Sequence, residues 1–173
     1  MWASKQKQQT GFTIVELLIV IVVIGILAAI TVVAYNGIRS RATDASVQSD
    51  LGQLAKQFGL FYASNGVYPS SPTDLQVLDV NINKSAYWLD AASPYNLVPC
   101  VTADLQQYSI TAIPISGKRL YVTNGGGVQE YTGATAWTGA SNYGPMCAST
   151  LSGSAVISSG SGYAGSWRTW TNG

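Results

Sequence analysis

One stretch near the N-terminus constrains the fold more than any other part of this 173-residue sequence. Residues 17–34 form an uncharged run of eighteen residues in which Leu, Ile, Val and Ala dominate. At about 1.5 Å per residue, a helix of this length comes close to the roughly 30 Å hydrocarbon core of a bilayer. In lipid only a helix or a closed barrel satisfies its own backbone groups, so the run predicts a membrane-spanning helix.

Glu16 stands at the front edge of this run, with no charged neighbour for several residues on either side. A charge at the membrane edge is costly, which indicates a functional role and requires a partner. Residues 12–31 contain no basic side chain. A new α-amino group would serve if the chain were cut before Phe12 and the amine of one copy faced Glu16 of another.

A polar, basic segment ending in Gly precedes the apolar run, and it reads Lys5-Gln6-Lys7-Gln8-Gln9-Thr10-Gly11, then Phe12-Thr13-Ile14-Val15-Glu16-Leu17. This segment resembles the prepilin signal of type IV pilins and of the related secretion and DNA-uptake pseudopilins. The resemblance implies that a membrane peptidase cuts after Gly11, that Phe12 becomes the methylated N-terminus, and that Glu16 is the assembly carboxylate. Many members carry Pro where this chain has Val33, so we expect the helix to stay continuous there.

The resemblance also implies a fold class and a domain organisation. We expect an α+β, type IV pilin-like fold, in which a long N-terminal helix packs on a small antiparallel β-sheet. One half of this helix spans the membrane and the other half is amphipathic. The expected segments are a leader (1–11), a transmembrane and filament-core helix (12–34), the amphipathic half of that helix (35–64), and a globular head with an αβ-type loop, a β-meander and a C-terminal disulfide loop (65–173).

An apolar stripe with spacings of four, three, four and three marks the amphipathic half, and it contains Val47, Leu51, Leu54, Phe58 and Phe61. This spacing predicts a helix face that packs on the head. We expect Asp44 and Asp50 to lie on other faces, and Gly52 and Gly59 to face the sheet. Asn65-Gly66 predicts the helix end, because Gly adopts the left-handed conformation of a C-cap without steric cost.

The rest of the head reads as one short helix and several strands. Residues 72–75 resemble a helix start. Alternation and turn residues predict a three-stranded antiparallel meander over residues 108–113, 119–123 and 128–131. Cys100 and Cys147 are the only cysteines, and an even pair in an exported domain predicts a structural disulfide rather than a metal or redox site.

Composition argues against several other functions. The sequence contains no His, which removes the commonest general base and metal ligand, so we expect no enzyme activity, cofactor or metal site. The formal charge is +1, and loss of Lys5 and Lys7 from the nine basic residues leaves seven against eight acidic ones, or −1. No basic patch indicates nucleic-acid binding.

The features together predict a structural subunit of a type IV pilus-like filament. Expected partners are other copies of the chain and related pilins, a prepilin peptidase and methyltransferase, an inner-membrane assembly platform, and membrane lipid before assembly. The expected location is the cytoplasmic membrane in a single pass with the N-terminus inside, then an extracellular or periplasmic filament. Alternatives are a pseudopilin of a type II secretion or DNA-uptake system, a singly anchored surface adhesin, and an ordinary secretory signal ending near Ala34.

Overall fold

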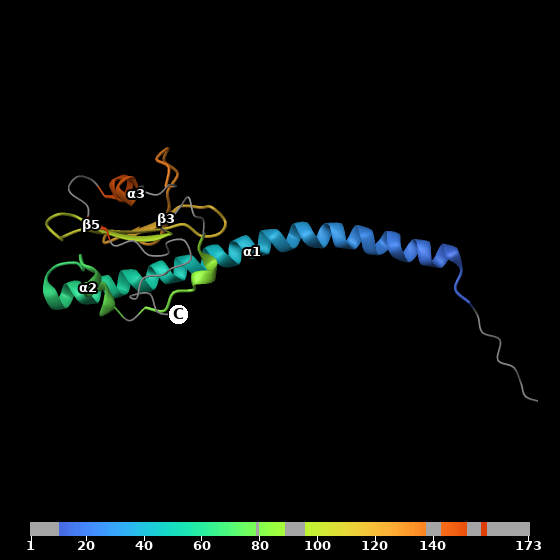
Figure 1. The fold of residues 1–173 in the computed structure, drawn as a ribbon, viewed down its shortest axis with the longest axis horizontal. Helices are drawn as coiled ribbons and strands as arrows, with labels where there is room; N and C mark the ends of the chain where they lie inside the picture. The colour runs from blue at the N-terminus through green and yellow to red at the C-terminus, as the bar shows by residue number, and fades with distance from the viewer. Residues whose placement is uncertain (1–10, 79, 89–95, 138–142, 152–156, 159–173) are drawn as a thin grey trace, which may run out of the picture. The chain divides into compact units, whose positions relative to one another are not determined.

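The computed structural model describes residues 11–78, 80–88, 96–137, 143–151 and 157–158 (Figure 1). Most of the expected leader, residues 1–10, lies outside this part of the chain. The chain divides into two compact units, residues 1–39 and residues 40–173. We describe each unit by itself.

The long N-terminal helix, α1, runs over Ile14–Asn65. It confirms the prediction of one helix from the apolar run to Asn65-Gly66, with no interruption at Val33. Gly66 has a φ of 72°, and its N–H donates to the carbonyl of Tyr62 over 2.7 Å. This left-handed residue therefore ends the helix in the way that the Asn-Gly pair indicates.

The second unit contains a five-stranded antiparallel sheet with the strand order β4-β3-β2-β1-β5. The strands are β1 (Leu97–Val101), β2 (Tyr108–Ala112), β3 (Leu120–Thr123), β4 (Gln129–Glu130) and β5 (Ile157–Ser158). The predicted meander is confirmed as β2, β3 and β4. Strand β1 was not predicted, because Pro99 lies at its centre, yet it pairs with β2 along its whole length.

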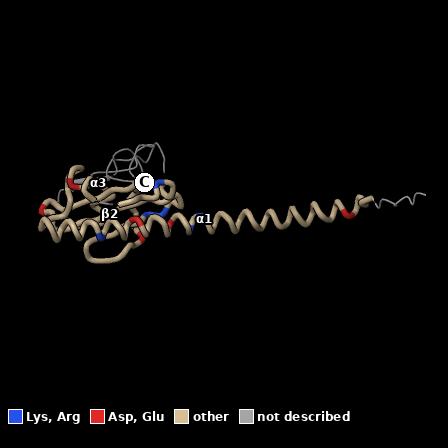
Figure 2. The backbone as a smooth tube through the Cα atoms, turned by 90° about the horizontal axis from the view of Figure 1, so that it is seen from below, with Lys and Arg blue, Asp and Glu red and all other residues tan. Residues whose placement is uncertain are grey.

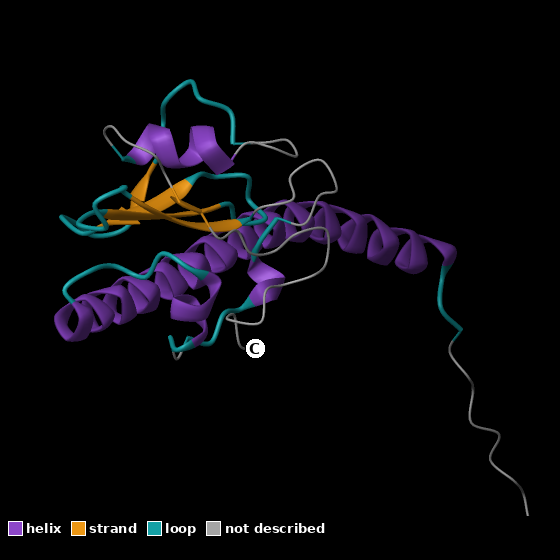
Figure 3. Ribbon diagram, turned by 60° about the vertical axis from the view of Figure 1, so that its left-hand side comes forward, coloured by secondary structure: helices purple, strands orange, loops and turns teal. Residues whose placement is uncertain are grey.

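The central strands of this sheet are buried on both faces, since every residue of β1 and β2 is buried. Alternate side chains along a strand point to opposite faces, so Leu97 packs toward one core and Val98 toward the other. One face packs on the second half of α1 through Val47, Leu51, Leu54 and Phe58. The other face packs on α3 (Tyr143–Thr150), and Figure 3 shows the three layers of this unit.

Two short helical segments and α3 complete the second unit. Helix α2 (Pro72–Gln76) confirms the predicted short helix, and Ser71 and Asp74 form a capping box at its start. A single turn of 3₁₀-helix covers Lys84–Ala86. Helix α3 lies in a region where the sequence predicted strands and no second helix, and its Pro145 falls in the first turn, where a proline is tolerated.

The structure corrects the predicted faces of α1. Asp44 and Asp50 are buried, with 8% and 4% of their surface exposed, and they lie on the face that packs on the head. Polar groups of the head offset the cost of burying both carboxylates, as described below. Gly52 and Gly59 were expected to face the sheet, but a Cβ built at either position meets nothing within 4 Å.

Candidate assembly site

The start of α1 is closed by a reciprocal pair of contacts between Thr13 and Glu16. The N–H and the hydroxyl of Thr13 donate to Oε2 of Glu16 over 2.8 and 2.7 Å, and the N–H of Glu16 donates to the Thr13 hydroxyl over 3.2 Å. This is a capping box, in which two helix-terminal N–H groups find side-chain acceptors. Gly11 and Phe12 precede the helix, and Phe12 is 84% exposed.

The next feature is the apolar surface of α1. Every residue from 17 to 38 is exposed in the single chain, and none of them is charged. Figure 2 shows this half of the helix without charge after Glu16, the next charged residue being Arg39. By length and composition, α1 is the one helix in the described part of the chain that qualifies to cross a membrane. Such a surface requires lipid or other apolar helices around it.

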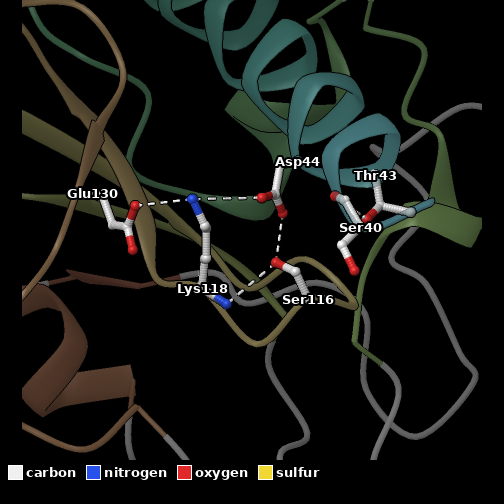
Figure 4. Close-up of polar contacts among 6 residues, drawn as sticks. All are labelled: Ser40, Thr43, Asp44, Ser116, Lys118 and Glu130. Atoms are coloured by element: carbon white, nitrogen blue, oxygen red, sulfur yellow. Dashed lines mark hydrogen bonds and ion pairs between the residues drawn. The ribbon is translucent and has the colours of Figure 1, made fainter. Parts of the chain in front are cut away.

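In the second unit, Asp44 joins α1 to the turn between β2 and β3 (Figure 4). The hydroxyl of Ser116 donates to Oδ1 of Asp44, and Nζ of Lys118 lies 3.6 Å from Oδ2. Lys118 also donates to Glu130 over 3.1 Å. The hydrogen bond to Glu130 and the charges of both carboxylates raise the pKa of Lys118.

A second carboxylate, Asp50, lies deeper in the interface between α1 and the head. Its Oδ2 accepts a hydrogen bond from the Tyr87 hydroxyl over 2.9 Å and one from the N–H of Asn83 over 3.2 Å. Burial raises the pKa of Asp50, although both hydrogen bonds oppose the shift. Burial and the nearby Asp50 carboxylate raise the pKa of Tyr87 well above its usual range.

The two cysteines form a disulfide, with Cα atoms 5.6 Å apart. The bond links Cys100 on β1 to Cys147 on α3, inside a small core that also contains Val98, Ile113, Trp137, Met146 and Leu151. The sequence predicted this pair without identifying the helix that carries its second member. Within the described residues, no group of three or more His, Cys, Asp or Glu side chains is arranged to hold a metal ion.

The comparison with known families bears directly on the helix start. Residues 6–32 match the family described as the prokaryotic N-terminal methylation motif. The chain carries a prepilin-type methylation motif. The motif includes Gly11, Phe12 and Glu16, the three positions singled out from the sequence.

Several curated proteins are similar to the chain over a little more than 70 residues. It is 32% identical over 75 residues to the type II secretion system core protein G of Vibrio cholerae, covering 43% of this chain and 51% of that protein. The corresponding protein of Klebsiella pneumoniae is 35% identical over 72 residues, covering 42% and 51%. The chain spans about half the length of these relatives. The methylation motif and the relatives together support membership of the pilin and pseudopilin family.

Sequence reasoning missed the local partner of Glu16. Thr13-Ile14-Val15-Glu16 has the Thr-x-x-Glu spacing of a capping box in front of an apolar run, and this signal was present in the methylation motif. In the single chain the Glu16 carboxylate therefore accepts hydrogen bonds from Thr13. The Thr13 groups are neutral, however, so these contacts do not neutralise the negative charge of Glu16.

Proposed function

We propose that this chain is a structural subunit of a pseudopilin filament of the type II secretion class. The observation that carries the proposal is the methylation motif over residues 6–32, which includes most of the fully exposed, uncharged helix surface of residues 17–38. The relatives named above are secretion pseudopilins, which favours this class over a type IV pilus or a DNA-uptake filament.

The first step is processing by a prepilin peptidase and methyltransferase. Cleavage falls between Gly11 and Phe12, and methylation follows on the new Phe12 amine. Both residues precede the first helical residue, Ile14, so the scissile bond lies in non-helical backbone, as peptidase substrates require. Before assembly, the subunit crosses the cytoplasmic membrane once with its N-terminus inside, and lipid covers residues 17–34.

The second step is transfer from lipid into the filament on an inner-membrane assembly platform. Lipid tails are as apolar as Leu or Ile, so apolar burial does not by itself favour helix contacts over lipid. Close packing of the helices and neutralisation of Glu16 must therefore supply the free energy that favours the filament over the membrane. In the filament, the Phe12 amine of a neighbouring copy pairs with Glu16, which offsets the cost of a charge in an apolar environment. The product is a periplasmic or extracellular filament.

The test separates the charge of Glu16 from its capping role. Glu16→Gln retains a carbonyl oxygen that accepts from Thr13, whereas Glu16→Ala removes both the charge and the acceptor. Each variant is produced together with a prepilin peptidase and a type II secretion assembly platform, and sheared filaments are counted by electron microscopy and immunoblotting. We expect both variants to lose filaments to the same extent. Wild-type filament levels in Glu16→Gln would show that the charge has no role.

A control for processing comes from the same samples. Mass spectrometry of the membrane fraction should find methylated Phe12 at the N-terminus of the wild-type chain. A singly anchored adhesin is the alternative from a different class, and it would leave the wild-type chain in the membrane fraction as monomers even when the assembly platform is present. Filaments that contain the wild-type chain exclude this alternative.

A further inference from the structure

The sequence contains four Asn-Gly pairs, at Asn36, Asn65, Asn124 and Asn172. Such pairs undergo a spontaneous reaction when the N–H of the glycine is free and the backbone can bend. The glycine nitrogen attacks the side-chain carbonyl carbon of the asparagine, and glycine presents no side chain to obstruct this attack. The first three pairs lie in the described part of the chain, and their surroundings differ sharply.

Two of these pairs are held by helix hydrogen bonds. Asn36-Gly37 lies inside α1, where each N–H donates to the carbonyl four residues earlier. At the end of α1, Nδ2 of Asn65 donates to the carbonyl of Phe61 over 2.9 Å, and the N–H of Gly66 donates to Tyr62 over 2.7 Å. Both reacting groups of the Asn65 pair are therefore already engaged.

The third pair lies in the exposed turn that follows β3 (Figure 1). The N–H of Gly126 donates to the carbonyl of Thr123 over 3.4 Å, which places Asn124 and Gly125 at the two central positions of a β-turn. Among the described residues, neither the Asn124 side chain nor the Gly125 N–H makes a hydrogen bond. A Cβ built at Gly125 meets nothing within 4 Å, so the surrounding space is open.

We propose that Asn124 is a site of spontaneous deamidation in the folded protein. The Gly125 nitrogen forms a bond to Cγ of Asn124, the bond from Cγ to the side-chain nitrogen breaks, and ammonia leaves. Water then opens the resulting succinimide at either carbonyl and gives aspartate or isoaspartate. The sequence of steps consumes one water, releases one ammonia and needs no oxidant or reductant.

The product changes the charge and the backbone of a turn that sets a strand register. Either product adds a carboxylate, and isoaspartate also inserts a methylene group into the main chain between β3 and β4. These strands pair Leu120 with Glu130 and Tyr121 with Gln129. Glu130 in turn holds Lys118. This inference does not rest on the proposed filament function.

The experiment follows the full-length chain in detergent at neutral to mildly alkaline pH. Samples taken over time in heavy-oxygen water are reduced, alkylated, digested and mapped by tandem mass spectrometry, which separates the Asn36, Asn65, Asn124 and Asn172 pairs. Oxygen incorporation reports ring opening, and an isoaspartyl methyltransferase labels isoaspartate. We expect Asn124 to react at least about tenfold faster than Asn65, which corresponds to about 1.4 kcal/mol in barrier height.

Two controls show whether the folded structure sets this ratio. In denaturant, the rates at Asn65 and Asn124 should converge, because the helix hydrogen bonds are lost. Gly125→Ala should slow the reaction at Asn124 without disturbing the fold, since the φ of Gly125 lies outside the left-handed region and the space is open. An Asn65 rate equal to that of Asn124 in the folded chain, or an unchanged ratio in denaturant, would overturn the proposal.

Discussion

The Tyr87 hydroxyl donates to the buried carboxylate of Asp50 over 2.9 Å, and this contact joins α1 to the segment before β1. Tyr87 is fully buried, and Asp50 is 4% exposed. A hydrogen bond to a carboxylate is stronger than one between neutral groups. The pair therefore fixes the position of the second half of α1 on the head through a polar contact inside an apolar interface.

Titration of Asp50 gives the pH dependence of this interface. Burial raises the pKa of Asp50 in the folded chain, so its stabilising contribution is greatest below the ordinary carboxyl pKa and is lost as the pH rises through the folded value. Asp50→Asn removes this titration and keeps an acceptor for Tyr87. We therefore expect its free energy of unfolding, measured in urea, to rise relative to the wild type as the pH increases above the ordinary carboxyl pKa.

Tyr87→Phe provides the complementary variant at the same contact. Loss of a hydrogen bond to a charged group should cost about 2 kcal/mol at neutral pH, and less in acid, where Asp50 is protonated. The hydrogen bond from Thr102 lowers the pKa of the exposed Asp104. Asp104 and similar exposed groups titrate equally in the variant and the wild type, so their contributions cancel in the difference between the two free energies of unfolding. Differences that do not change with pH would contradict the role given to Asp50.

Asp44 should stabilise the head more through Ser116 than through Lys118. Asp44→Ala removes the charged acceptor of the half-buried Ser116 hydroxyl and should cost about 2 kcal/mol in the free energy of unfolding. Lys118→Met should cost much less, because the Lys118 side chain is 44% exposed and solvent screens its charge. Asp44→Asn is the matched control, since it keeps an acceptor. Equal losses in Asp44→Ala and Lys118→Met would contradict this ranking.

The disulfide should contribute substantially to stability. Closing a loop with a sequence separation of 47 residues stabilises by about 4 kcal/mol on the chain-entropy argument. The double variant Cys100→Ala and Cys147→Ala should lose an amount of this order in urea unfolding. Hydrogen exchange should accelerate first in β1 and α3, which the bond connects. An unchanged unfolding midpoint in the double variant would show that the packing of Trp137 and Met146 suffices without the bond.

Two glycines of the second unit should respond to alanine in opposite directions. Gly59 is exposed inside α1 with open space at its Cβ, so Gly59→Ala should stabilise by about 1 kcal/mol through helix propensity. Gly66 has a φ of 72°, where an L-residue is strained, so Gly66→Ala should destabilise by about 1 kcal/mol. Thermal unfolding followed by circular dichroism measures both. A destabilising Gly59→Ala would indicate a close neighbour at that position after all.

Local patterns predicted those elements in which short-range signals and tertiary packing agree. Periodicity and the Asn-Gly pair gave the extent of α1, and alternation between turn residues gave β2, β3 and β4. Strand β1 escaped prediction because a proline normally argues against an interior strand. Within the described residues, β5 pairs with β1 at Cys100 and Val101, so no described strand residue pairs with Pro99 on that side. The pairing of β1 with β5 joins residues more than fifty positions apart in the sequence, so local patterns do not predict it.

The misplaced carboxylates of α1 have a similar physical origin. Asp44, Val47, Leu51 and Leu54 are spaced by three, four and three, which is the spacing of one helix face, but charged residues are normally assigned to solvent. Their burial depends on donors from residues 83–87 and from Ser116, which are far away in the sequence. The Thr13 contact to Glu16, in contrast, was readable from local spacing.

The position of the disulfide has a mechanical consequence. The bond joins β1 to α3 across the face of the sheet that points away from α1, and the sequence contains no further cysteines. A pulling force applied along the second half of α1 is therefore resisted by shear of Leu51, Leu54 and Phe58 against the sheet and by the hydrogen bonds to Asp44 and Asp50. Reducing agents would loosen the packing of α3 on the sheet, whereas the contacts between α1 and the sheet that resist the force contain no disulfide.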